Sequence, residues 1–202
     1  MYNRPFTPEF ITVLKPNEIF VFGSNLQGMH GGGAARMAYE QFGAVMGQGV
    51  GLQGQSYAIP TMQGGVETIE PYVDEFIAFA KSHPEYTFLV TPIGCGIAGF
   101  MAEEIAPLFY HAMDVENIIL PEDFAEIVNE LHERFIDSFD HDSDRNMDQY
   151  LNTMEPDRFA CLYGPPPVTW DASDPDSHNS GSIKPSILSK WIKKILSSNS
   201  RN

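Results

Sequence analysis

Short apolar runs alternate with longer amphipathic stretches along the first 140 residues of the chain. The apolar runs predict strands at Glu18–Gly23, Tyr57–Pro60, Thr87–Thr91 and Asn117–Leu120. The stretches with apolar positions at helical spacing predict helices at Ala34–Phe42, Ile69–Ser82, Ala102–Met113 and 121–139. Unbroken apolar runs are typical of parallel strands that are covered on both faces. The alternation therefore predicts a three-layer α/β/α fold with a mixed, mostly parallel central sheet.

Several local features refine these elements. Met37, Phe42 and Tyr39 are expected to face the sheet from the first helix, and Thr68 is expected to cap the second. Pro107 should lie near the start of the third helix or kink it. The segment from Gly43 to Ser56 carries five glycines and predicts irregular backbone, either a second wall of a binding cleft or a mobile surface loop.

The composition changes after residue 140, which predicts one α/β domain at 1–140 and an extension at 141–202. The extension is acidic and Pro-rich at first and ends in a basic amphipathic helix, with apolar positions from Ile187 to Leu196. This helix is expected either to dock on the acidic body of its own chain or to bind a membrane surface or a partner.

The charge and the cysteine content exclude several function classes. A formal net charge of −15 disfavours nonspecific nucleic-acid binding, which depends on a basic surface. No apolar run is long enough to predict a transmembrane segment. The only two cysteines, Cys95 and Cys161, are too few for a disulfide scaffold or a tetrahedral zinc site. We therefore expect a cytoplasmic protein with no metal site and no cofactor.

A glycine-rich segment follows directly on the first predicted strand and leads into the first predicted helix. Its candidate ligand-binding residues are Gly23, Ser24, Asn25, Gly31, Gly32, Gly33 and Ala34. Glycines let a ligand approach the backbone N–H groups of a helix N-terminus, which favour an anion. The alternative is an ordinary strand–helix connection in which glycine only permits close packing. Three consecutive glycines cost considerable backbone entropy, and this favours a ligand loop.

A second glycine-rich segment follows the third predicted strand and also leads into a helix. Its candidate ligand-binding residues are Ile93, Gly94, Cys95, Gly96, Ile97, Ala98, Gly99 and Phe100. In an open α/β sheet, ligands bind outside the carboxyl ends of the strands, so the two segments can converge on one ligand. Two anion-binding loops suggest a diphosphate. The chain has no P-loop spacing, and GGGAA at 31–35 lacks the G-x-G-x-x-G spacing of a dinucleotide-binding fingerprint.

The two segments, GSNLQGMHGGGAA at 23–35 and GCGIAGF at 94–100, resemble a divergent, bacterial or phage-type member of the macro-domain superfamily, whose members bind ADP-ribose and related nucleotides. The resemblance implies a macro-domain-like fold in which Asn25 faces the distal ribose. It also implies that residues 31–33 and 94–99 line the diphosphate and that Phe100 packs near the nucleotide. The adenine-binding Gly-Asp-Ile-Thr segment and the Gln-Glu-Glu signature of poly(ADP-ribose) glycohydrolases have no counterpart here.

A hydrolase for ADP-ribosyl linkages would require a catalytic group, and Asn25 and His30 are the candidates. His30 could accept a proton from the attacking water, or it could only hydrogen-bond a phosphate or its own loop. Cys95 lies before a helix N-terminus, which could lower its pKa, although a packing role is the favoured interpretation. The alternatives are a non-catalytic reader of ADP-ribose-type signals and a Rossmann-like nucleotide phosphoribohydrolase, whose P-G-G-x-G-T-x-x-E segment is absent.

Overall fold

The computed structural model describes the backbone of residues 2–141 and the side chains of residues 2–134. The elements in chain order are β1 (Glu18–Ser24), α1 (Gly33–Gln41), β2 (Gly51–Gln53), β3 (Ser56–Pro60), η1 (Val66–Thr68), α2 (Glu70–Ser82), β4 (Thr87–Val90), α3 (Ala102–Ile105), η2 (Ala106–Asp114), β5 (Ile118–Ile119) and α4 (Glu122–His141). The chain divides into two units, Met1–Arg134 and Phe135–Asn202, and the sheet belongs to the first. The amphipathic helix expected at Ile187–Leu196 lies outside the described residues.

The five strands form one sheet in the order β2-β3-β1-β4-β5. β1 pairs in parallel with both β3 and β4, and β4 pairs in parallel with β5. Only β2 runs antiparallel, beside β3 at the sheet edge. The predicted mixed, mostly parallel α/β sheet is therefore confirmed. Its topology brings the carboxyl ends of β3, β1 and β4 next to one another.

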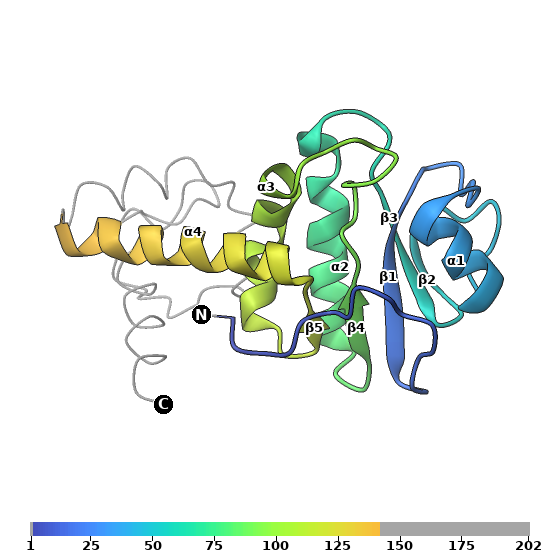
Figure 1. Ribbon diagram of the computed structural model, residues 1–202, viewed down its shortest axis with the longest axis horizontal. Coiled ribbons are helices and arrows are strands. Elements are labelled where there is room, and N and C mark those ends of the chain that lie inside the picture. The colour runs from blue at the N-terminus through green and yellow to red at the C-terminus, as the bar shows by residue number, and fades with distance from the viewer. Residues whose placement is uncertain (1, 142–202) are drawn as a thin grey trace, which may run out of the picture. The chain divides into compact units, whose positions relative to one another are not determined.

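Side chains of β1 alternate between two apolar clusters on the two faces of the sheet. Phe20 and Phe22 pack with α1, and Ile19 and Val21 pack with α2, so the two helices lie on opposite sides of β1 (Figure 1). The apolar face predicted for the second helix is buried as expected, with Ile69, Val73, Phe76, Ile77 and Ala80 in the core. With β1 and β4 adjacent and parallel, the strand–helix connections that follow them lie at the same end of the sheet.

Two local predictions were wrong. Tyr39 is exposed, whereas Met37 and Phe42 pack on this face of the sheet as predicted, together with the small residues Ala35 and Ala38. Thr68 does not cap α2, because η1 leads directly into the helix and the Thr68 hydroxyl donates to the Gly65 carbonyl at 2.7 Å. These are differences of packing that helical spacing alone cannot predict.

Two predicted elements also have a different internal structure. The segment predicted to be irregular contains β2, which joins β3 through a tight turn at Gly54 with φ of +58°. The third helix is interrupted at Pro107, as its position suggested: α3 ends at Ile105 and the chain continues as the 3-10 helix η2. Proline has no N–H to donate to the carbonyl of Glu103, so the α-helical ladder stops there. Across residues 2–141, no helix combines the length and the apolar content that crossing a bilayer requires.

Candidate functional site

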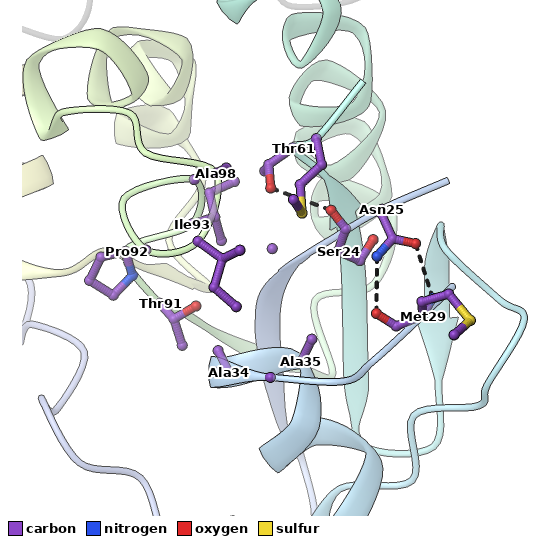
Figure 2. Close-up of a pocket in the computed structure, with 17 residues that line it drawn as sticks. Ser24, Asn25, Met29, Ala34, Ala35, Thr61, Thr91, Pro92, Ile93 and Ala98 are labelled. Atoms are coloured by element: carbon purple, nitrogen blue, oxygen red, sulfur yellow. Dashed lines mark hydrogen bonds between the residues drawn. The ribbon is translucent and has the colours of Figure 1, made fainter. Parts of the chain in front are cut away.

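A pocket opens at the carboxyl ends of β1, β3 and β4 (Figure 2). It is lined by Gly23, Ser24, Asn25, Met29, Gly32, Gly33, Ala34, Ala35, Thr61, Met62, Thr91, Pro92, Ile93, Gly94, Gly96, Ile97 and Ala98. We call residues 25–32 the first glycine loop and residues 91–101 the second glycine loop. The structure therefore brings the two segments together, as their strand-end positions predicted.

The first glycine loop delivers the N-terminus of α1 to the pocket. Gly32 is the N-cap residue, and no side chain accepts a hydrogen bond from the first turn of the helix. The leading N–H groups of an α-helix have no intrahelical acceptor, so those at Gly33, Ala34 and Ala35 are available at the pocket wall. Gly33 adopts φ of +56°, which only glycine adopts without strain. These donors and the helix dipole favour an anion here.

The second glycine loop is closed by its own backbone. The Cys95 N–H donates to the Pro92 carbonyl at 3.2 Å, and the Phe100 N–H donates to the Gly94 carbonyl at 3.1 Å. Gly94 has φ of +75°, and a Cβ there would lie 3.2 Å from the side chain of Ile105. Glycine at this position is therefore required by both conformation and space.

Ile97 brings the second glycine loop against the first. A Cβ at Gly32 would lie 3.0 Å from Ile97 Cδ1, although the Ile97 side chain is 73% exposed. A large exposed apolar side chain that rests on a glycine of the opposite loop forms part of the pocket rim. Any side chain at Gly32 would have to displace it.

Asn25 lines the pocket and also braces the first glycine loop. Its Nδ2 donates to the Met29 carbonyl at 3.0 Å, and its Oδ1 accepts from the Met29 N–H at 3.0 Å (Figure 2). A carboxamide has two N–H hydrogens and two lone pairs on oxygen. One hydrogen and one lone pair therefore remain for a ligand.

His30 does not reach the pocket. It is fully buried, its ring meets the Phe22 ring edge-on at 5.2 Å, and Nε2 lies 3.1 Å from the Val45 carbonyl and 3.2 Å from the Gln48 carbonyl. Two carbonyl partners require Nε2 to carry the hydrogen, and Nδ1 has no partner among the described residues. The placement supports the alternative in which His30 only hydrogen-bonds its own surroundings, and it argues against a general base.

Four other candidate residues lie beside the pocket and do not line it. Gly31 is exposed, Gly99 turns the second glycine loop with φ of +81°, and Phe100 packs against Gly94. Cys95 is half-buried, and burial, followed by the negative charges of Asp123, Glu103 and Glu104, raises the pKa of its thiol to about 11. A raised thiol pKa agrees with the favoured packing role and not with an activated thiol. The N-terminus of α3 does not lower the pKa of Cys95, because the Glu104 carboxylate already accepts from the Met101 N–H there at 2.8 Å.

Sequence reasoning missed several lining residues, chiefly Thr61 and Met62 after β3, Thr91 and Pro92 after β4, and Met29. The strand-end rule could have found the first four, since β3 and β4 end at Pro60 and Val90 beside the end of β1. Figure 2 shows the side chains of Thr61 and Thr91 on either side of the space between the loops.

The distribution of charged residues along the sequence also marks the segments that line the pocket. None of the lining residues is titratable, and in this chain of formal charge −15 the segments 19–35, 41–66 and 86–102 contain no Asp, Glu, Lys or Arg. These three segments supply all of the lining residues in the described part of the chain. Within the described part of the chain, no group of three or more His, Cys, Asp and Glu residues could hold a metal ion. The described lining of the pocket is therefore uncharged, although the chain as a whole is acidic.

Comparisons with protein-family models, with curated proteins and with solved structures found no match for this chain. The resemblance to the macro-domain superfamily rests on the two glycine-rich segments, and membership of that superfamily stays a prediction.

Proposed function

We propose that the chain binds ADP-ribose or a related NAD-derived nucleotide between the two glycine loops. The observation that carries the proposal is the uncapped N-terminus of α1, which opens into a pocket without charged side chains. Carboxylates would repel a diphosphate, and they are absent from every segment that lines the pocket. The backbone donors of the α1 N-terminus suit the phosphate oxygens. The resemblance of residues 23–35 and 94–100 to macro domains supports the same ligand class.

The same lining favours a reader over a hydrolase. General acid–base catalysis needs a titratable group within hydrogen-bond reach of the reacting atoms. Among residues 2–134 no titratable side chain lines the pocket, and His30 is buried behind the first glycine loop. Asn25 can orient a ligand, but it cannot accept a proton at neutral pH. We therefore propose a binding module that recognises or sequesters an ADP-ribose-type signal. The absence of a lining glutamate likewise disfavours a nucleotide phosphoribohydrolase.

The size of the pocket limits how the ligand is held. The cavity volume is about 170 Å³, which is below the roughly 300–1,000 Å³ typical of pockets that enclose a drug-sized ligand. The pocket can enclose a phosphate and part of a sugar, and the remainder of a nucleotide would lie across the rim. Exposed apolar side chains at that rim, Met29, Met62 and Ile97, offer contact surface.

Calorimetry with ADP-ribose tests the proposal. Wild-type protein should show saturable binding, and Gly32→Glu should weaken it at least tenfold, because the new carboxylate would displace Ile97 and face the diphosphate. Gln41→Glu adds the same charge at the exposed far end of α1 and should change the affinity less than twofold. Absence of wild-type binding at millimolar ADP-ribose would reject the proposal. Release of free ADP-ribose from ADP-ribosylated substrates would favour the hydrolase instead.

A further inference from the structure

The backbone N–H of Gly94 is an unusual donor. Gly94 is buried, and among the described residues its N–H makes no hydrogen bond, although its carbonyl accepts from Phe100. Nearly all buried backbone N–H groups in folded proteins are paired. The neighbouring N–H groups of Ile93 and Cys95 follow that rule and donate to Thr91 and Pro92. Because Gly94 lines the pocket, its N–H is available to donate to a ligand there.

The space in front of this donor is kept open by Gly23. A Cβ at Gly23 would lie 3.3 Å from Gly94 N and also 3.3 Å from Thr61 Oγ1. Gly23 belongs to β1 and is not among the glycines with positive φ, so its backbone conformation does not require glycine. Gly23, Thr61 and Gly94 all line the pocket, and a side chain at Gly23 would press against the Gly94 donor and the Thr61 hydroxyl.

The Thr61 hydroxyl faces this space as an acceptor. Thr61 is buried, its N–H donates to the Ser24 carbonyl at 2.9 Å, and its Oγ1 donates to the same carbonyl at 3.4 Å (Figure 2). The hydroxyl hydrogen is thereby directed at the protein, and the oxygen lone pairs remain for a ligand. One small space is thus bordered by one hydrogen-bond donor and one acceptor.

We infer that the floor of the pocket is a subsite for a sugar hydroxyl, which accepts from the Gly94 N–H and donates to Thr61 Oγ1. A hydroxyl is both donor and acceptor, whereas a phosphate oxygen has no hydrogen to donate to Thr61. The phosphate belongs instead at the α1 N-terminus, on the opposite wall. The inference rests on the proposed function and deepens it, because it assigns the enclosed part of the ligand to a ribosyl phosphate and makes the hydroxyl a determinant of specificity.

Paired titrations with ADP-ribose and inorganic pyrophosphate, followed by amide NMR, test the subsite. Thr61→Val keeps the volume and removes the acceptor, and it should weaken ADP-ribose about three- to tenfold while changing pyrophosphate less than twofold. Gly23→Ala fills the subsite and should weaken ADP-ribose at least as much, again without affecting pyrophosphate. The Gly94 amide resonance of wild-type protein should move with ADP-ribose and stay in place with pyrophosphate.

Thr87→Val is the matched control, since Thr87 begins the strand β4 whose other end carries the second glycine loop. It should leave both affinities unchanged. Equal losses for the two ligands in Thr61→Val, or no loss for ADP-ribose, would overturn the hydroxyl subsite while leaving the proposed function intact. If wild-type protein binds neither ligand, the proposed function itself fails and the subsite with it.

Discussion

The two glycine loops reach the same pocket, but they are held in place in different ways. The first glycine loop is fixed from behind by a second segment of the chain: the Gly47 N–H donates to the Gly28 carbonyl at 3.0 Å, and His30 bonds to the backbone of the same segment. The second glycine loop is fixed by hydrogen bonds within itself and, at Thr91, by hydrogen bonds to the Val21 carbonyl of β1. The geometry of the first loop therefore depends on residues 43–50, and that of the second loop does not.

The helices that follow the two loops differ in how their N-termini are capped. α1 begins without any side-chain cap and opens into the pocket, whereas the short α3 begins with Glu104 bonded to the Met101 N–H. A carboxylate at a helix N-terminus occupies the position that an anionic ligand would take. The first loop therefore offers an open helix N-terminus, whereas the second offers loop N–H groups such as that of Gly94.

The largest expected effect is on the free energy of unfolding. A substitution in residues 43–50, which support the first glycine loop, should lower it far more than a substitution in the second glycine loop. A Cβ at Gly49 would lie 2.2 Å from the Asn25 carbonyl oxygen, whereas a Cβ at Gly96 in the second glycine loop would meet nothing within 4 Å. Gly49→Ala must move backbone and should lower the free energy of unfolding by about 3 kcal/mol, while Gly96→Ala should change it by less than about 0.5 kcal/mol. Urea denaturation measures both. Equal stabilities of the two variants would show that the first loop can move away from this segment freely.

Replacing His30 tests whether its hydrogen bonds to the backbone of Val45 and Gln48 hold the first glycine loop in place. His30→Ala would remove a fully buried ring and its contacts with Val45 and Gln48, so stability should fall by about 2–4 kcal/mol. Affinity for ADP-ribose should fall with it, because the α1 N-terminus is carried by the same loop. Thermal unfolding and calorimetry on the same samples measure the two effects. A variant with unchanged stability and affinity but reduced ADP-ribosyl hydrolysis would restore His30 as a catalytic residue.

The sequence predicted the parts of this arrangement that depend on local patterns. Apolar runs located β1, β3 and β4, and glycine runs at their ends located both walls of the pocket. The pattern could not show that residues 43–50 fold behind His30, because that contact joins segments about fifteen residues apart through carbonyl oxygens that every residue has. Thr61 was missed for a related reason: one hydroxyl after a strand is ordinary until the neighbouring strand end is known.

The smallest expected effect concerns Cys95 and the closed N-terminus of α3. Burial is the first cause of its raised thiol pKa of about 11, and the nearby carboxylates of Asp123, Glu103 and Glu104 add to it. The thiol stays protonated at pH 8, so alkylation by iodoacetamide in a Cys161→Ser background should be roughly a hundredfold slower than for an ordinary cysteine and should accelerate toward pH 11.

Glu103→Gln removes one of these charges and should raise that rate only about two- to fivefold, because burial, the larger cause, is unchanged. Glu40→Gln, on the exposed face of α1, removes the same charge far from the thiol and serves as the control. If Cys95 reacts at pH 7 as fast as a free thiol, the dipole of α3 reaches the second glycine loop despite Glu104. The two loops would then be alike in offering a helix N-terminus, and the second could bind a phosphate as the first is proposed to do.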